Sequence, residues 1–452
     1  MPSLYTRLAS GVLFPLHERL KGHDSVARLR ALERSQFLPP ADLAALQLAK
    51  LKRFLADIGS HVPFYKARFA AAGFDPAALR SVADLARLPV LTKADIRAHG
   101  EAMKSDHAGP LTRYNTGGSS GEPLIFYMGR GRKSHDVAAK WRATRWWGVD
   151  IGDPELVVWG SPIELGAQDR VRQLRDAVMR SRLLPAFEMS PANLDRFVAR
   201  IRAVRPAMLF GYPSSLALIA RHARAQGIAM DRLGIRVVFV TSEKLYDDQR
   251  ADIAAVFGAP VANGYGARDA GFIAHQCPAG SLHLSAEDIV VETLLPDGSA
   301  AGIGQPGEIT VTHLATNDFP FVRYRTGDIG VLGDELCSCG RTLPVLRSVE
   351  GRTTDFVVAK DGTVMHGLAL IYTLRDLPGV ERFRIEQLSL DETRVLVVAG
   401  AAFDAAAEAR IQREFKARLG AAVTVRVERV DEIPAEASGK FRYVVSRVAV
   451  AQ

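Results

Sequence analysis

Short apolar runs alternate with longer amphipathic segments between residues 150 and 265, and this alternation limits the fold more than any other feature. The runs at residues 156–159, 207–210 and 237–240 have the length and composition of buried strands, and residues 214–226 have the spacing of a helix. Strands that alternate with helices favour an open, mostly parallel sheet, which binds ligands at the carboxyl ends of its strands. We therefore expect an α/β fold with a ligand site where these strands end.

The flanking segments predict how the rest of the chain is organised. At 452 residues the chain is long enough for two or three domains. Residues 1–90 have helical patterns, and residues 270–350 have the alternation and turns of a β-rich subdomain. We predict that both belong to a large domain over residues 1–350, followed by a small α/β domain over residues 351–452. In the small domain the patterns predict two strands and a helix, near residues 394–398, 423–430 and 405–419.

The composition is that of a globular protein with an excess of basic residues. Hydrophobic residues make up 48% of the chain and charged residues 24%, both close to the averages for globular domains. There are 58 Lys and Arg against 50 Asp and Glu, which gives a formal net charge of +8. This excess, which includes a cluster at residues 130–133, favours anionic ligands, whereas the sequence has no motif typical of nucleic-acid binding.

The sequence favours a cytoplasmic protein. No apolar run reaches the roughly 18 residues that are needed to span a membrane. Residues 1–20 lack the continuous apolar segment and the cleavage site of a secretory signal. We interpret them as an amphipathic helix packed on the body of the protein, with contact to a membrane surface as the alternative. Three cysteines are too few for a disulfide framework and fit a reducing compartment.

A loop rich in glycine and hydroxyl side chains has the composition of a phosphate-binding turn. Its three glycines and three hydroxyl residues are Thr116, Gly117, Gly118, Ser119, Ser120 and Gly121. Glycines let the backbone approach a ligand closely, and successive N–H groups in such a turn can form an anion-binding nest. The loop is not a Walker A motif, because no Gly-Lys-Ser/Thr follows the glycines. It predicts a polyphosphate ligand, with an ordinary Gly/Ser-rich surface turn as the alternative.

Four further motifs follow this loop, and their order resembles a known superfamily. They are Gly264-Tyr265-Gly266-Ala267-Arg268-Asp269, Arg323-Tyr324-Arg325-Thr326-Gly327-Asp328, Gly351-Arg352-Thr353-Thr354-Asp355 and Pro434-Ala435-Glu436-Ala437-Ser438-Gly439-Lys440. With the loop, they resemble the motifs of the adenylate-forming superfamily over nearly the whole chain. Within that superfamily the sequence looks most like the phenylacetate-CoA ligase group and its CapK-like relatives from capsule biosynthesis.

The resemblance implies a two-step, AMP-forming reaction. A carboxylate attacks the α-phosphorus of ATP in the presence of Mg²⁺, which gives an acyl-adenylate and pyrophosphate, and the thiol of CoA then displaces AMP. The group suggests an aryl or arylalkyl acid. Two alternatives stay open: transfer of the acyl group to a carrier protein, an amine or a sugar, or a non-catalytic relative that has kept the fold. The resemblance also implies that the small C-terminal domain is a mobile lid.

The resemblance assigns the reacting groups to a few residues. Lys440, carried on the lid, would reach the α-phosphate and the carboxylate during adenylation. Asp269 stands where the family usually has a glutamate that holds Mg²⁺, and carboxylate oxygens are ligands that Mg²⁺ accepts. Arg268 replaces a Ser or Thr and would bind the substrate carboxylate or the α-phosphate, or pair with Asp269. Glu122 and Thr354 also depart from the family pattern, in the phosphate loop and at the hinge.

Other residues are assigned to the nucleotide. The ring of Tyr265, between Gly264 and Gly266, would stack on adenine, with a core tyrosine as the alternative. The carboxylate of Asp328 matches the two ribose hydroxyls, and Arg352 would lie near the same sugar. Ser242 and Glu243 are expected beside the nucleotide because they follow a predicted strand, and the segment from Gly264 to Gly266 is predicted to follow another strand in the same way.

The cysteines suggest a second site. Cys277 and His283 lie six residues apart, and Cys337 and Cys339 are separated by one residue. Three thiolates and an imidazole form a closed, tetrahedral zinc site of the structural kind, and several phenylacetate-CoA ligase relatives carry one. His275 competes with His283 as the fourth ligand. The alternative is three free, buried thiols.

Overall fold

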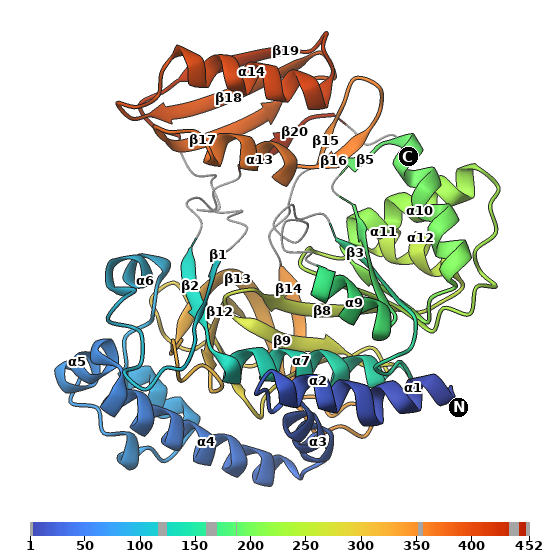
Figure 1. Cartoon of the computed structure of the whole chain (residues 1–452). Helices are drawn as coiled ribbons and strands as arrows, with labels where there is room; N and C mark the ends of the chain where they lie inside the picture. Colours follow the sequence, from blue (N-terminus) through green and yellow to red (C-terminus); the bar gives the residue numbers. More distant parts are fainter. Residues whose placement is uncertain are drawn as a thin grey trace.

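The computed structural model describes residues 3–115, 124–159, 170–186, 188–350, 356–433 and 443–448. Figure 1 shows a large body below and a small C-terminal unit above it. One sheet runs through the body, with helices from the first part of the chain beneath it.

Helices dominate the first hundred residues. In chain order they are α1 (Leu4–Leu8), the π-helical segment η1 (Ala9–Leu13), α2 (Phe14–Leu20), α3 (Ser25–Ser35), α4 (Pro40–His61), α5 (Pro63–Ala71), the 3₁₀ turns η2 (Pro76–Ala78) and η3 (Val82–Arg87), and α6 (Lys93–His99). Thr92 caps α6 through its side chain, which accepts a hydrogen bond from the Asp95 amide at 3.1 Å. Within the described residues, none of the helices is both long and apolar enough to cross a membrane.

Half of the main sheet is parallel, as the alternating runs predict. Its strands, in spatial order, are β4 (Ser181–Pro185), β3 (Glu155–Trp159), β6 (Met208–Gly211), β7 (Val237–Thr241) and β8 (Val261–Ala267). The helices around it are α7 (Arg130–Arg145), α9 (Arg170–Val178), α10 (Pro191–Val204), α11 (Pro213–Ala225) and α12 (Asp247–Phe257). Leu209 and Val238, on the central strands, are fully buried in the core between this half and its helices.

The other half of the same sheet is antiparallel. Its strands are β9 (Gly271–Gln276), β10 (Leu282–Leu284), β14 (Val345–Glu350), β13 (Tyr324–Gly333), β12 (Pro306–His313) and β11 (Ile289–Leu294). The β-rich segment predicted from the sequence therefore continues the parallel half, because β9 turns back directly onto β8. Gly271, with φ of +94°, provides the left-handed backbone that this reversal needs. Among the described residues, eleven strands make up this one mixed sheet.

The C-terminal unit has a sheet and a core of its own. Its elements are β15 (Phe356–Val358), β16 (Val364–His366), α13 (Leu368–Arg375), β17 (Val380–Gln387), β18 (Glu392–Ala399), α14 (Ala405–Leu419), β19 (Thr424–Arg429) and β20 (Val444–Ser446). The predicted strands and helix match β18, β19 and α14. Among the described residues, β16 of this unit pairs with β5 (Glu188–Met189), a strand of the preceding part of the chain.

Candidate active site

The carboxyl ends of β7 and β8, where the sequence predicts a nucleotide, lie side by side. Thr241 and Gly264 are the last partners in the parallel ladder between these two strands. Ser242, directly after β7, has φ of +74°, a left-handed conformation that is rare for a residue with a Cβ. Glu243 follows and accepts a hydrogen bond from the Ser214 hydroxyl. Ser242 and Glu243, as predicted, directly follow a strand, and the chain turns sharply away from the sheet there, beside β8.

The Gly264–Gly266 motif lies inside β8, which corrects the prediction that it follows the strand. A Cβ at Gly266 would come within 2.3 Å of the carbonyl oxygen of Gly271, and one at Gly264 within 2.8 Å of the Phe239 ring. These glycines let β8 pack against β9 and the neighbouring strand where a side chain would collide. The register shift between Tyr265 and Gly266 turns this end of β8 into a bulge.

Tyr265 and Asp328 meet across the sheet. The Tyr265 hydroxyl donates a hydrogen bond to Oδ2 of Asp328 at 3.0 Å, and both side chains are half-buried. Asp328 is on β13, and its amide donates to Thr326 Oγ1 at 3.2 Å. The structure thus brings together the residues predicted to contact adenine and ribose, although they are 63 positions apart in the chain.

Asp269 and Arg268 occupy the turn between β8 and β9. Asp269 is only 6% exposed and accepts a hydrogen bond from the Tyr324 hydroxyl at 2.5 Å on Oδ2. Arg268 donates from Nη1 to the carbonyl oxygen of Asn115 at 3.3 Å. A guanidinium and a carboxylate from one turn therefore face β13 and the end of β1 (Thr112–Asn115).

The phosphate loop connects two paired strands. β1 pairs antiparallel with β2 (Ile125–Met128), and Asn115 is opposite Ile125. Arg268 thus contacts the residue immediately before the loop. Several predicted site residues lie outside the described residues: Thr116, Gly117, Gly118, Ser119, Ser120, Gly121, Arg352 and Lys440.

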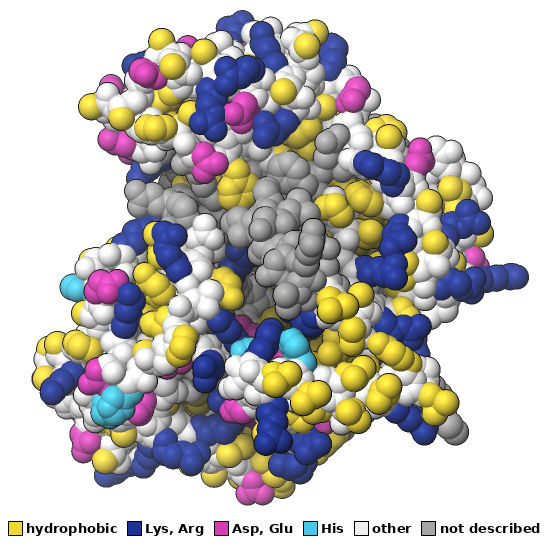
Figure 2. All heavy atoms as spheres, viewed as in Figure 1, with side chains coloured by type: hydrophobic (Ala, Val, Ile, Leu, Met, Phe, Trp, Pro, Cys, Tyr) yellow, Lys and Arg dark blue, Asp and Glu magenta, His cyan; other side chains and the backbone are white. Residues whose placement is uncertain are grey.

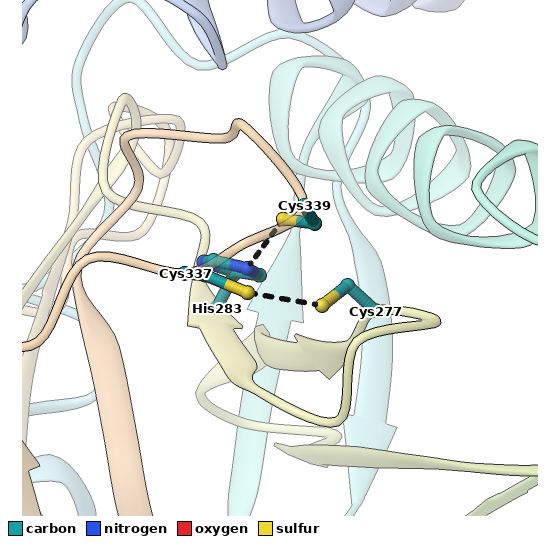
Figure 3. Close-up of side chains that lie close together, drawn as sticks. All are labelled: Cys277, His283, Cys337 and Cys339. Atoms are coloured by element: carbon teal, nitrogen blue, oxygen red, sulfur yellow. Dashed lines mark hydrogen bonds between the residues drawn. The ribbon is translucent and has the colours of Figure 1, made fainter.

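The Cys/His cluster, defined as Cys277, His283, Cys337 and Cys339, comes together where β9, β10 and β14 adjoin (Figure 3). Cys277 Sγ lies 3.6 Å from Cys337 Sγ, and Cys339 Sγ lies 3.3 Å from His283 Nε2. All four ligand atoms lie within 4.8 Å of one another. Zinc–sulfur bonds of about 2.3 Å in a tetrahedron place two sulfurs about 3.8 Å apart, which is close to the spacing of the first pair.

Two details fit the cluster to a metal ion. His283 Nδ1 lies 3.0 Å from the Leu343 carbonyl oxygen, a contact that makes Nδ1 the protonated nitrogen and directs the Nε2 lone pair at the thiols. Burial, together with the contact to Cys337, raises the pKa of Cys277 to about 11. Because a metal ion binds the thiolate, it would take the place of this proton.

The structure distinguishes the two histidines that the sequence left as competing ligands. His275 lies opposite His283 in the β9–β10 ladder but is not part of the cluster. Its ring lies against those of Phe239 and Phe272, with centroids 5.9 and 5.5 Å away. Burial lowers the pKa of His275 to about 3, so this histidine is a neutral core residue.

Comparison with known proteins gives relatives for both parts of the chain. The CapK C-terminal domain family matches residues 357–447. Protein CapK of Staphylococcus aureus is 24% identical over 372 residues, which are 81% of each chain. A phenylacetate-coenzyme A ligase of Thermus thermophilus is 26% identical over 450 residues and is covered to 97%, with 90% of this chain aligned.

A crystal structure of 2-hydroxyisobutyryl-CoA ligase in complex with 2-HIB-AMP and CoA superposes with a TM-score of 0.66 at 23% identity, over 91% of each chain. The chain has the adenylate-forming fold and is a relative of CapK and the phenylacetate-coenzyme A ligases. We call the following residues, which lie at the carboxyl ends of β7 and β8, in the turn after β8 and on β13, the strand-end site: Ser242, Glu243, Tyr265, Arg268, Asp269, Tyr324 and Asp328.

Sequence reasoning missed two residues that position this site. Tyr324 is fully buried and holds the Asp269 carboxylate; its place in the motif that ends at Asp328 was the available signal. Arg132 on α7 is 2% exposed and donates to the carbonyl oxygens of Arg268 and Asp269 at 3.2 and 3.3 Å. The sequence showed Arg132 only as a member of a basic cluster.

Proposed function

We propose that the chain is an ATP-dependent, AMP-forming acid–thiol ligase that makes an acyl-adenylate and then a CoA thioester from an aryl or arylalkyl acid. The observation that carries this proposal is the strand-end site. A guanidinium, a buried carboxylate, a half-buried aromatic ring and a second carboxylate converge there from β8, β13 and the turn after β8. These are the groups that a nucleotide and a reacting carboxylate need.

The nucleoside contacts come from Tyr265 and Asp328. The Tyr265 ring stacks on adenine, and its hydroxyl keeps the Asp328 carboxylate oriented for the ribose diol. Arg352 contributes to the same sugar, and Ser242 and Glu243 contact the nucleotide from the turn after β7. Pairing of Tyr265 with Asp328 is compatible with this role because a carboxylate accepts several hydrogen bonds at once.

The reacting groups are handled by Asp269, Arg268 and Lys440. Asp269 would hold Mg²⁺, whose charge neutralises the α-phosphate; Tyr324 engages Oδ2, so Oδ1 suits an oxygen-ligated ion. Arg268 orients the substrate carboxylate or the α-phosphate, and the amides and hydroxyls of residues 116–121 bind the β- and γ-phosphates. Lys440 reaches the α-phosphate from the C-terminal domain. Such groups act by positioning and by charge stabilisation.

The small domain, residues 351–452, acts as a lid over the large domain, residues 1–350. Its pairing with the body through β16 and β5 involves two residue pairs, Val364 with Met189 and Met365 with Glu188. A contact of this size can break and re-form while the core of the lid stays intact. Rotation of the lid would then withdraw Lys440 between the two half-reactions.

The Cys/His cluster binds a structural zinc ion. Its ligand set of three thiols and one imidazole is complete, and the contact from Leu343 to His283 supplies the second-shell support that such sites have. The ion ties the turn that bears Cys337 and Cys339 to β9 and β10. A closed, four-ligand site has no open position for a substrate, so its role is in folding.

ATP–pyrophosphate exchange tests the function. The panel contains phenylacetate, benzoate, 2-hydroxyisobutyrate and a medium-chain fatty acid, each with and without CoA. Exchange with the aryl acids and CoA-dependent release of AMP are expected. Exchange without CoA-dependent release of AMP would indicate that the acyl acceptor is a carrier protein, an amine or a sugar. Absence of exchange with every acid, in folded protein, would favour the non-catalytic alternative.

A further inference from the structure

A stripe of aliphatic side chains runs along the outside of the first helices. The helical run from Leu4 to Leu20 is continuous through α1, η1 and α2. Its outward-facing aliphatic residues and their exposed fractions are Leu4 84%, Leu8 47%, Val12 55%, Leu16 55% and Leu20 80%. We call these five residues the aliphatic stripe. Figure 2 shows hydrophobic side chains gathered over α1 and α2, with Lys and Arg side chains around them.

The local helix geometry keeps these residues in line. They are spaced by four positions throughout, whereas an α-helix repeats every 3.6 residues, so a stripe with this spacing would drift around a regular helix. The π-helical segment η1 (Ala9–Leu13) uses more residues per turn. It therefore rotates the second half of the run back towards the first. This segment lies in the middle of the run, where it reduces the drift of the aliphatic stripe around the helix axis.

The side that faces the protein is small or polar in most places. Thr6 donates a hydrogen bond to Asp153 Oδ1 at 2.9 Å, and Glu18 accepts from Ser25 and contacts His23 at 3.1 Å. A Cβ at Gly152 would lie 2.3 Å from that of Ala9, so the run packs closely on the body there. The sequence predicted an amphipathic helix packed on the body; the structure shows that most of its large aliphatic side chains point away.

Basic residues border the aliphatic stripe. Within residues 3–23 the exposed charged side chains are Arg7, Arg19 and Lys21, and the one acidic residue, Glu18, is 3% exposed. Arg180 adds a further cation from the neighbouring turn, with its guanidinium 5.1 Å from the centre of the Tyr5 ring. Directly after the run, the exposed Asp24 is paired with Arg28, whose Nε lies 2.8 Å from Asp24 Oδ1. An apolar face whose border is mostly basic complements an anionic lipid surface.

We propose that the helical run Leu4–Leu20 is a docking surface for an anionic lipid bilayer, in which it lies in the plane of the interface. Aliphatic side chains enter the acyl region while the basic border stays among the headgroups. Charge favours this occupant over a second copy of the chain: an isologous interface centred on the aliphatic stripe would bring two like-charged borders together. The proposal is independent of the strand-end site and of the acyl-transfer chemistry.

Sedimentation with lipid vesicles tests the proposal on the full chain. The wild-type protein is expected to sediment with vesicles of equal parts phosphatidylcholine and phosphatidylglycerol, and much less with phosphatidylcholine alone. The triple variant Leu8→Ser, Val12→Asn, Leu16→Ser should lose at least about ten-fold in partitioning, because each aliphatic side chain contributes to transfer into the interface. Leu336→Ser is the matched control: Leu336 is 80% exposed but lies outside the aliphatic stripe, so partitioning should not change.

A second pair of measurements separates charge from hydrophobicity and guards against misfolding. Arg7→Gln with Arg19→Gln should weaken binding to the anionic vesicles, as should about 0.5 M NaCl, which shortens the screening length to a few ångströms. Thermal unfolding and pyrophosphate exchange without vesicles should match wild type in every variant. Wild-type protein that fails to sediment, or a triple variant that sediments equally well, would overturn the proposal. So would a wild-type dimer that the triple variant converts to a monomer without vesicle binding.

Discussion

The strand-end site and the Cys/His cluster are built from neighbouring strands of one sheet but differ in how complete they are. The cluster draws its four ligands from described segments, and they converge to within 4.8 Å. In the strand-end site, Tyr265 is held by Asp328 and Asp269 by Tyr324, while its other expected partners, residues 116–121 and Lys440, come from a loop and from the C-terminal domain. The cluster has all its ligands in place, whereas the strand-end site, under the proposed function, would be completed by substrates and by these other segments of the chain.

This difference predicts that substitutions in the two sites affect different properties of the protein, folding stability in one case and catalysis in the other. Damage to a closed cluster should reduce folding stability and leave the chemistry of the remaining folded molecules intact. Damage to an open site on a rigid sheet should reduce catalysis and leave stability almost unchanged. Each of the following substitutions tests one side of that contrast.

Removal of the metal should have the largest effect. Cys337→Ser is expected to abolish zinc binding, lower the free energy of unfolding by on the order of 5 kcal/mol, and leave exchange activity measurable at low temperature, because structural zinc contributes folding energy. Metal content and thermal unfolding are the measurements. Ser338→Ala, one residue away on an exposed position, is the matched control and should retain one equivalent of zinc. A metal-free wild-type protein of full stability would exclude the zinc site.

Substitution of His283 and of His275 tests which histidine binds the metal. His283→Asn should lose the metal because the imidazole is part of the cluster. His275→Asn should retain it, since that ring packs against Phe272, although a buried substitution there will cost stability. Loss of zinc in His275→Asn but not in His283→Asn would contradict the ligand assignment.

Asp269→Asn is expected to have the largest effect on catalysis. The amide keeps the volume of the side chain and an oxygen for Tyr324 but removes the negative charge, so exchange should fall by about 10²- to 10³-fold, the range found when one group that stabilises a transition state is removed. The melting temperature should stay close to that of the wild type. Pyrophosphate exchange at saturating ATP measures the loss, and near-normal exchange would refute a role for this carboxylate in holding Mg²⁺.

The parts of this architecture that the sequence predicted depend on local pattern. Apolar runs predicted β3, β6 and β7 because strands buried on both faces must be apolar along their whole length. Ser242 and Glu243 were predicted because they directly follow one of these apolar runs, and parallel sheets bind ligands at the carboxyl ends of their strands. The Gly264–Gly266 motif was predicted to follow its strand. Pairing with β9, which a local pattern does not reveal, extends β8 through the motif.

The other features depend on contacts between distant segments. His275 and His283 are equivalent as zinc ligands in the sequence, and only the position of the turn with Cys337 and Cys339 distinguishes them. The role of Arg132 depends on backbone carbonyls 136 and 137 positions away, and backbone acceptors carry no sequence signature. Orientation of the aliphatic stripe likewise depends on η1 and on the polar contacts of Thr6 and Glu18 with the body.

Arg132 connects the two sides of the contrast, because it is buried like a structural residue but positions the turn that carries Asp269. Arg132→Lys keeps a cation for Asp136 but cannot donate to both carbonyls as well, so the maximal exchange rate should fall about ten-fold, the effect of roughly one lost charge-assisted hydrogen bond. The KM for ATP should change little. Arg145→Lys, on the same helix and paired with Glu33 and Asp150, is the control and should leave exchange unchanged. An equal loss in both variants would show that α7 acts through stability alone.

Tyr265→Phe should have the smallest effect. It tests whether Tyr265 contributes to nucleotide binding and not to the reaction at the phosphate. The variant keeps the ring for stacking but loses the 3.0 Å hydrogen bond to Asp328, so the carboxylate is less firmly oriented toward the ribose. We expect a rise of about three- to ten-fold in the KM for ATP with little change in the maximal rate, which corresponds to about 1 kcal/mol of uniform binding. Tyr5→Phe, which removes a tyrosine hydrogen bond to the Val178 carbonyl far from the site, should leave both parameters unchanged. A fall in maximal rate with an unaltered KM would instead place Tyr265 among the groups that act on the reacting phosphate, and the nucleoside end of the site would then depend on Asp328 and Arg352.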